Sequence, residues 1–194
     1  MRWFFALTAA VAGERLAELV WSRAHERRMA QRGGRVVPEP WYAAMVAVHA
    51  GTLVAAPIEA ALRRSPPPRS LTGLGLAGLA AATALRLWTL RALGDSWSTR
   101  VTRFDGGGRR VVTTGPYRYI RHPNYVAVIL ELAALPLVGG AWVTALVASA
   151  LDALVLSRRI PLEEREMAHD AIWRASVLPR PRFIPRLGRT REPA

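Results

Sequence analysis

The side chains most able to do chemistry in this chain lie at residues 115–125. This segment reads Gly-Pro-Tyr-Arg-Tyr-Ile-Arg-His-Pro-Asn-Tyr and leads directly into a mostly apolar stretch, residues 126–137. Cationic and hydrogen-bonding groups at a bilayer boundary are costly to leave unpaired, so such a cluster is typical of a site for a polar or anionic ligand. Pro123 suits the first turn of a helix, whose positive end beside Arg121 and His122 could hold a carboxylate. The alternative is a helix start whose side chains only anchor in lipid headgroups.

Residues 158–164 form a second polar group and read Arg-Arg-Ile-Pro-Leu-Glu-Glu. Arg159 and Glu163 are four residues apart, which places them on one face of a helix. Such a pair is often a surface ion pair worth about 0.2–0.5 kcal/mol. In the functional interpretation, Glu163 or Glu164 binds an ammonium group while Arg159 holds an acidic substrate. A pocket with both elements suits a zwitterion such as an amino-acid head group.

The elements that must position these two groups are long apolar blocks, which are typical of a membrane protein. About half of the 194 residues are apolar (51%). Because crossing a bilayer takes roughly 20 apolar residues, we expect spans at residues 3–21, 41–62 and 71–93, then a hairpin of 125–137 and 141–156. The sequence therefore predicts an all-α bundle of four or five transmembrane helices with a pocket at one face. We expect one membrane-embedded domain, residues 1–178, and an Arg/Pro-rich tail, residues 179–194.

The basic residues are distributed as in a membrane protein. All 27 are arginine and the net charge is +13, which in a soluble protein would suggest a nucleic-acid partner. Here the arginines flank the apolar blocks, so the positive-inside rule explains them better. Segments 22–40, 94–124 and 158–194 carry five, six and nine arginines and share one side if the amino terminus faces outward. We expect that side to be cytoplasmic, although loop 63–69, with three arginines, counts against it.

Several other chemistries are excluded or unsupported. The chain has no cysteine, which excludes disulfides, thiolate catalysis and cysteine-ligated metal sites. Its four histidines are scattered, so we expect no metal site. Residues 73–78 spell a formal GxGxxG, the pattern of a nucleotide-binding turn, but no strand precedes them. Small residues in an apolar span favour close helix packing instead. Glu14 and Glu18 share a face of the first helix, which should point into the bundle or else end in the headgroups.

The two polar groups resemble those of a known family. Residues 115–125, with their Arg-His-Pro-x-Tyr core, and the later Arg-x-x-x-Glu-Glu resemble the isoprenylcysteine carboxyl methyltransferase family of integral membrane enzymes, over roughly residues 85–170. The amino-terminal half, with Glu-Arg-Leu-Ala-Glu at 14–18 and Arg-Gly-Gly at 32–34, is similar to a bacterial branch found with type III polyketide synthases. That branch is linked to O-methylation of alkylpyrones or alkylresorcinols. The resemblance implies a multi-pass protein of the bacterial inner membrane.

The resemblance also implies a cofactor, S-adenosylmethionine, and residues for it. The cofactor would contact segment 109–112, partly through backbone, the turn that begins the fourth span, and the acidic residues of the last helix. Arg159 would lie at the acceptor. The implied cofactor-binding residues are Val111, Val112, Tyr117, His122, Pro123, Asn124, Tyr125, Glu163 and Glu164.

Methyl transfer from a sulfonium needs alignment and a poorly hydrated site, not a metal. A carboxylate or an acidic enol acceptor is already ionised at neutral pH, whereas a phenol, with a pKa of about 10, would need a base such as His122 or Glu164. We expect a lipophilic acceptor that enters laterally between helices. One alternative is N-methylation of a phospholipid amine, whose ammonium Arg159 would repel. Another is a non-catalytic membrane scaffold or transporter subunit, which would need neither His122 nor Glu163.

Overall fold

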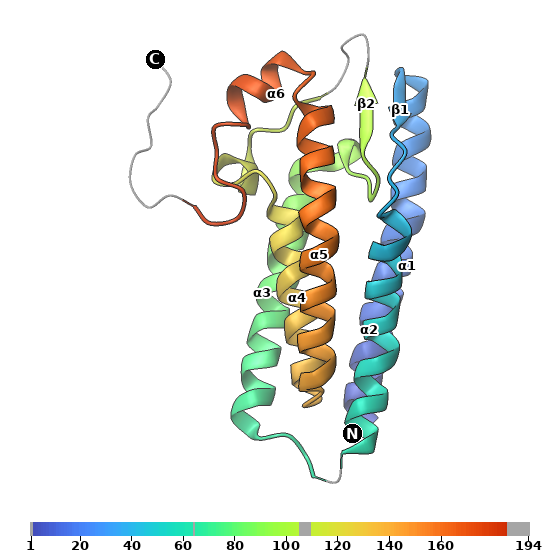
Figure 1. Cartoon of the computed structure of the whole chain (residues 1–194), viewed down its shortest axis with the longest axis vertical. Helices are drawn as coiled ribbons and strands as arrows, with labels where there is room; N and C mark the ends of the chain where they lie inside the picture. The colour runs from blue at the N-terminus through green and yellow to red at the C-terminus, as the bar shows by residue number, and fades with distance from the viewer. Residues whose placement is uncertain (1, 64, 105–109, 186–194) are drawn as a thin grey trace.

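The computed structural model describes residues 2–63, 65–104 and 110–185, and these residues form a bundle of long helices (Figure 1). In chain order the elements are α1 (Arg2–Gln31), β1 (Gly34–Val36), α2 (Tyr42–Leu62), α3 (Arg69–Leu93), η1 (Gly94–Ser96), β2 (Thr102–Phe104), η2 (Gly115–Arg118), α4 (Pro123–Val138), α5 (Trp142–Met167) and α6 (Ala171–Ser176).

The five long helices run along one axis (Figure 1). Helix α3 packs against α4, α4 against α5, α5 against α2, and α2 against α1. The short elements β1, β2, η1, η2 and α6 lie together at the upper end, which we call the head. The amino terminus and the loops after α2 and α4 lie at the lower end. The described parts of the three arginine-rich segments therefore share the head end of the bundle.

Each expected span corresponds to a helix, but two helices are longer than predicted. Helix α1 continues to Gln31 and α5 to Met167, because both carry charged turns that hydropathy alone does not include. By length and composition, α2 and the α3–η1 segment could each cross a bilayer, and α4 is a shorter apolar helix. The prediction of an all-helical membrane bundle agrees with this architecture, apart from two three-residue strands.

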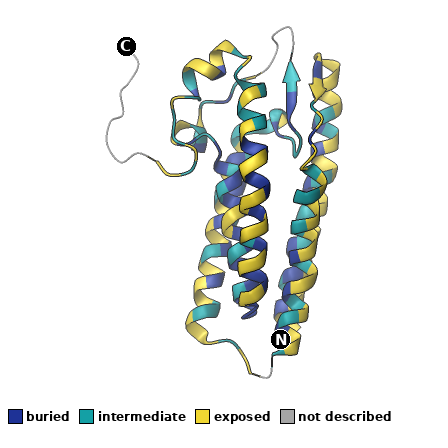
Figure 2. Ribbon diagram, viewed as in Figure 1, coloured by how far each residue is buried: buried dark blue, intermediate teal, exposed yellow. Residues whose placement is uncertain are grey.

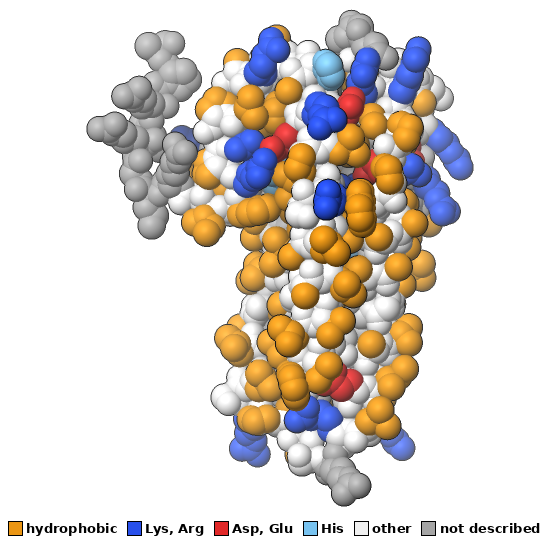
Figure 3. Space-filling view, viewed as in Figure 1, with side chains coloured by type: hydrophobic (Ala, Val, Ile, Leu, Met, Phe, Trp, Pro, Cys, Tyr) orange, Lys and Arg blue, Asp and Glu red, His pale blue; other side chains and the backbone are white. Residues whose placement is uncertain are grey.

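The outer surface of the shaft is apolar. Exposed residues run down the helices below the head (Figure 2), and apolar side chains cover this region while arginines gather mainly at the head (Figure 3). Trp3 and Trp142, near the lower end, and Trp21 and Trp88, nearer the head, are all exposed. At 1.5 Å per residue, Trp3 and Trp21 are about 27 Å apart along α1, close to the roughly 30 Å of a bilayer's hydrocarbon core. Two aromatic belts at this spacing are typical of a membrane-embedded shaft.

Small residues bring α3 and α4 close together. A Cβ at Gly75 would lie 2.7 Å from the backbone nitrogen of Val138, and one at Gly78 would lie 3.0 Å from the Cβ of Ala134. These are two of the glycines of the formal GxGxxG, so the expectation that this run serves helix packing is confirmed for them. The contact fixes α4, and hence the turn that begins it, against α3.

The antiparallel pair β1 and β2 holds the head together. Gly34 pairs with Phe104 and Val36 with Thr102, and the backbone N–H of Val37 donates to the carbonyl of Val101 at 2.9 Å. The pairing brings the segment before α2 beside the segment after α3. The segment after α3 contributes residues to the cavity described next.

Candidate active site

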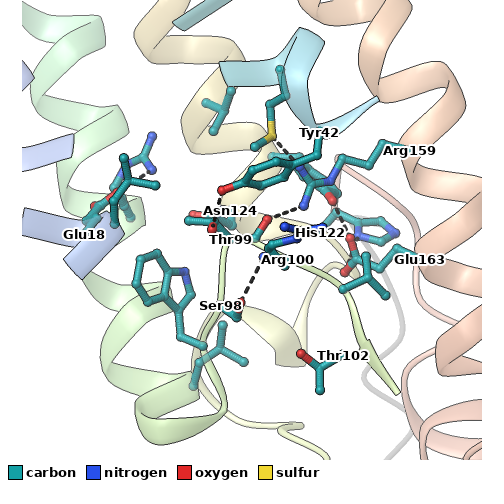
Figure 4. A pocket seen from close by; sticks show the side chains of 18 of the residues that line it. Glu18, Tyr42, Ser98, Thr99, Arg100, Thr102, His122, Asn124, Arg159 and Glu163 are labelled. Carbon is teal, nitrogen blue, oxygen red and sulfur yellow. Dashed lines mark hydrogen bonds and ion pairs between the residues drawn. The ribbon is translucent and has the colours of Figure 1, made fainter. Parts of the chain in front are cut away.

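A cavity of about 540 Å³ lies below the head, and residues of all five long helices line it. Figure 4 shows Glu18, from α1, at one side and Glu163, from α5, at the other. Thr99 and Asn124 lie between them. The lining also includes apolar side chains of α1, α2, α4 and α5, such as Leu19, Leu53, Val128 and Leu156. One cavity therefore joins the polar head to the apolar shaft.

His122 ends the loop before α4, and Glu164 fixes its ring. The imidazole is buried, and its Nε2 lies 3.0 Å from Glu164 Oε1. Arg121 Nη1 donates to the same oxygen at 2.9 Å, and Arg182 Nη2 donates to Oε2 at 2.7 Å. Burial alone would raise the pKa of Glu164, but the hydrogen bonds from His122 and Arg182 and the charge of Arg121 outweigh it and lower that pKa to about 2. Glu164 is thus a fixed carboxylate behind the histidine.

Glu163 faces the cavity on the other side of the same histidine. Its Oε2 accepts a short hydrogen bond from the hydroxyl of Tyr125, and its Oε1 lies 4.0 Å from His122 Nδ1. Asn124, from the first turn of α4, lines the same part of the cavity, and its buried Oδ1 has no hydrogen-bond partner among the described residues.

Arg159 extends from α5 toward the segment before α2. The guanidinium is buried; Nη2 lies 3.1 Å from Glu39 Oε2 and donates to the carbonyl of Thr99, while Nη1 points at the sulfur of Met45. Glu39 also accepts from the backbone N–H of Val101 at 2.7 Å. Burial raises the pKa of Glu39 above its ordinary value, although Arg159 and the Val101 hydrogen bond oppose the rise. Glu39 and the Thr99 carbonyl thus hold the guanidinium in place, and Arg159 also lines the cavity.

The chain segment after α6 closes the head over the α4 turn. The backbone N–H groups of Arg121 and His122 donate to the carbonyls of Pro181 and Arg182 at 2.9 and 3.1 Å. Phe183 packs against the small buried cluster of Tyr125, Leu156 and Ile160. Residues 180–183, part of the expected tail, thus pack against the candidate site; residues 186–194 lie outside the described part of the chain.

A group of buried charges lies at the α1 side of the cavity, and we call Arg15, Glu18, Arg86 and Glu131 the ion-pair cluster. Arg86 Nη2 lies 2.9 Å from Glu131 Oε2, and Arg86 Nη1 lies 3.4 Å from Glu18 Oε2. Arg15 Nη1 lies 2.8 Å from the same oxygen of Glu18. The expectation that the charged face of the first helix points into the bundle is confirmed for Glu18, which is buried.

The structure brings together most of the residues predicted from the sequence. Those that line the cavity are Val111, Val112, Tyr117, His122, Asn124, Tyr125, Arg159 and Glu163. Pro123 is buried as the first residue of α4, and Glu164 holds His122 from behind; neither lines the cavity. Residue 109 of the expected segment 109–112 lies outside the described residues.

Sequence reasoning missed three contributors. Glu39 stands between two prolines just before α2, and only the fold brings it to Arg159. Asp152 lines the cavity from α5, and a lone acid in an apolar span was a signal that could have found it. The contact of residues 180–183 with the α4 turn had no local signal, because it joins segments about sixty residues apart.

Comparison with known proteins identifies the family of this chain. Residues 74–169 match the isoprenylcysteine carboxyl methyltransferase family, and this stretch contains both polar groups of the cavity. The chain is also 31% identical over 165 residues to the uncharacterised protein YpbQ of Bacillus subtilis (strain 168), covering 84% of this chain and 96% of YpbQ. The chain belongs to the isoprenylcysteine carboxyl methyltransferase family. Its family and its apolar helices indicate a membrane methyltransferase.

Proposed function

We propose that this protein is an S-adenosylmethionine-dependent O-methyltransferase of the membrane that acts on a lipophilic acceptor. The observation that carries the proposal is the single cavity that joins the α4 turn and Glu163 to apolar faces of the shaft. A polar cofactor and an apolar acceptor need such a shared space if a methyl group is to pass directly between them.

The polar part of the cavity fits the cofactor. Asn124 Oδ1 and Trp97 Nε1 both line the cavity, and both are buried without a partner among the described residues. Buried polar atoms of this kind are normally hydrogen-bonded, so an acceptor and a donor left open support a polar ligand. Glu163 adds a negative charge for an ammonium or sulfonium group. Val111 and Val112 offer backbone groups, and His122 lies beside the carboxylate of Glu163.

When bound, the cofactor supplies an electrophilic methyl group attached to a positively charged sulfur. The protein's own residues have three tasks. Arg159, held by Glu39, stabilises negative charge on the acceptor oxygen, and one such positioned donor is worth about 10²–10³ in rate. The head and residues 180–183 cover the site, which limits its hydration. Glu164 fixes the ring of His122, which we assign to cofactor binding.

The location follows from charge. The described arginine-rich segments share the head end, and arginine-rich loops are retained in the cytoplasm. We therefore place the head at the cytoplasmic face of a bacterial inner membrane. The acceptor enters from the bilayer between the helices, and lipid surrounds the shaft.

Two alternatives are less well supported. A phospholipid amine acceptor is protonated at neutral pH, and the buried cation of Arg159 at the cavity would repel it. A non-catalytic scaffold would have no use for the open polar atoms of Asn124 and Trp97. The cofactor-binding experiment separates the scaffold from both enzymes.

The first test is S-adenosylmethionine binding to the detergent-purified protein, measured by calorimetry. We expect micromolar-range binding by the wild type and at least a tenfold weaker affinity for His122→Ala and for Glu163→Gln. The matched controls are His169→Ala, an exposed histidine, and Glu166→Gln, one turn further along α5 and outside the cavity lining. Both controls should bind like the wild type. A folded wild type that does not bind the cofactor would overturn the proposal in favour of the scaffold.

A further inference from the structure

Asp152 is a buried acid in the apolar part of the cavity. The residue lies on α5, is 2% exposed, and lines the cavity. Its Oδ1 has no hydrogen-bond partner among the described residues. An unpaired acid at membrane depth is costly, and such residues commonly face a ligand or a proton path.

Other acids of the cavity are already engaged. Glu18 pairs with Arg15 and Arg86, and Glu163 accepts from Tyr125. Asp152 differs from them because no hydrogen bond or ion pair within the described part of the chain engages its carboxylate, whereas Glu18 and Glu163 each have a charged or hydrogen-bonding partner.

The same comparison applies to the bases considered from the sequence. Glu164 accepts from three side chains, does not line the cavity, and has a pKa lowered to about 2 by those partners despite its burial. His122 lies between Glu163 and Glu164, with one ring nitrogen near each. Neither is placed to take a proton from a group in the apolar part of the cavity.

Asp152 and Arg159 share one face of α5. They are seven residues apart, about two helical turns and 10.5 Å along the axis, with Glu163 one turn beyond Arg159. From the shaft toward the head, the cavity face of α5 thus presents an open acid, then a cation, then the carboxylate assigned to the cofactor.

We propose that Asp152 is the general base of the reaction and that the acceptor is a neutral hydroxyl on an apolar molecule, such as a phenol. This inference rests on the proposed methyltransferase function. The proton of the acceptor hydroxyl passes to the Asp152 carboxylate as the oxygen forms its bond to the methyl carbon. The methyl–sulfur bond breaks, and its electron pair stays on sulfur. Arg159 stabilises the negative charge that develops on the oxygen.

The arrangement disfavours the other acceptor classes. A carboxylate acceptor is already ionised at neutral pH, needs no base, and would be repelled by an ionised Asp152. An ionised Asp152 would bind an alkylamine as the protonated ammonium. The nitrogen of an ammonium has no lone pair with which to attack the methyl group. A hydroxyl needs both a proton acceptor and a nearby cation.

The test uses three detergent-purified proteins: the wild type, Asp152→Asn, which keeps the shape but cannot take up the proton, and the control Asp95→Asn. Asp95 is half-exposed, outside the cavity lining, and paired with Arg28. The hydroxyl probe is an alkylated 7-hydroxycoumarin, whose neutral and ionised forms absorb at different wavelengths. Its methyl ether, a farnesylated N-acetylcysteine carboxylate and a long-chain alkylamine complete the set. Cofactor binding, probe absorbance and transfer of a labelled methyl group are measured for each protein.

We expect the wild type to methylate the hydroxyl probe in preference to the carboxylate and the amine, and to shift the absorbance of the bound neutral probe, because its hydroxyl donates a hydrogen bond to the Asp152 carboxylate. Asp152→Asn should lower this transfer by about 10²–10⁴-fold and abolish the absorbance change, with cofactor affinity within twofold of the wild type. Asp95→Asn should match the wild type throughout. Removing an unpaired buried acid should not lower the melting temperature.

Three outcomes would overturn the role of Asp152 while leaving the methyltransferase proposal intact. The first is transfer to the hydroxyl probe by Asp152→Asn at the wild-type rate. The second is a preference for the carboxylate or the amine. The third is a lower melting temperature for Asp152→Asn with an unchanged absorbance response, which would mark a structural acid. Failure of the wild type to bind the cofactor would overturn the proposed function together with this inference.

Discussion

Two regions on opposite sides of the same cavity use the same residue types differently. In the ion-pair cluster on α1, α3 and α4, Arg86 lies between Glu18 and Glu131, and each acid has an arginine partner. On the cavity face of α5, the acids Asp152 and Glu163 have no arginine within salt-bridge distance among the described residues. Arg159 is there paired with Glu39, a residue from another segment.

The difference shows how burial alone fails to identify a functional charge. Most of these side chains are buried, and buried charges are tolerated where partners compensate the lost hydration. In the ion-pair cluster the compensation comes from within the protein. On the cavity face of α5 the protein supplies only part of this compensation. We infer that a ligand supplies the rest. Three substitutions test this contrast, beginning with the one that should have the largest effect.

Replacing Arg86 with leucine should break the ion-pair cluster. The change removes the shared cation and leaves Glu131 without its 2.9 Å partner. Removing one member of a buried ion pair costs about 3–5 kcal/mol, and we expect a loss of that size in the free energy of unfolding in detergent. The matched control is Arg91→Leu, an exposed arginine at the end of α3, which should change the value by no more than about 0.5 kcal/mol.

A second substitution should restore much of the lost stability. In Arg86→Leu/Glu131→Leu no unpaired acid remains at this position, and Glu18 keeps Arg15 at 2.8 Å. If the single variant were as stable as the wild type, the cluster would not be a structural unit, and Arg86 would have to be reconsidered as part of the ligand site.

Replacing Arg159 with alanine should affect chemistry more than cofactor binding. It removes the cation that we place at the acceptor oxygen, so methyl transfer should fall by about 10²–10³-fold, with cofactor affinity within about twofold. The matched control is Arg158→Ala, the adjacent exposed arginine, which lies 5.9 Å from the ring of Trp41. Single-turnover transfer of a labelled methyl group, with calorimetry for the cofactor, measures both quantities.

The variant Arg159→Lys sharpens the result. A lysine keeps the charge but cannot contact Glu39 and the Thr99 carbonyl with the same planar group, so partial activity is expected. Wild-type turnover by Arg159→Ala would contradict the assigned role and would restore the amine acceptor as a candidate.

How far the sequence predicted this molecule depends on the range of each contact. The shaft was predictable because an apolar block long enough to cross a bilayer forms a helix whatever its neighbours are. The charged extensions of α1 and α5 were not predictable in this way, because contacts with the head stabilise those turns and hydropathy does not report such contacts. His122, Glu163 and Arg159 were found because motif and i,i+4 spacing are local. Glu39 reaches Arg159 only through a contact between residues 120 positions apart, for which spacing gives no signal.

Asp152 is a different kind of omission. The block at residues 141–156 was interpreted by its hydropathy, and averaging over a window hides one acid among many apolar residues. The information was in the sequence, because an ionisable residue within a span is by itself a functional hypothesis. The structure adds that Asp152 lines a cavity and that its Oδ1 has no hydrogen-bond partner among the described residues.

The smallest of the three effects should come from Glu164→Gln, which tests the carboxylate that holds His122 from behind. Burial raises the pKa of Glu164, but the hydrogen bonds from His122 and Arg182 and the charge of Arg121 outweigh it and lower the pKa to about 2. Because the pKa is lower in the folded state, Glu164 stabilises the fold above its ordinary value of 4.5, and this contribution is lost as the pH falls toward 2. At neutral pH the variant should be less stable by about 2 kcal/mol, the scale of a hydrogen bond to a charged group.

If the charge of Glu164 stabilises the fold, the difference in unfolding free energy between the wild type and the variant should depend on pH. The unfolding free energies of the wild type and Glu164→Gln should differ most above pH 5 and converge as the pH falls through the range from 4.5 to 2. Glu166→Gln, on the same helix but paired with Arg103, serves as the control. A gap between wild type and variant that stayed constant down to pH 2 would mean that the fixed charge of Glu164 is not what holds the histidine. The loss of cofactor affinity in His122→Ala would then need an explanation that does not involve this carboxylate.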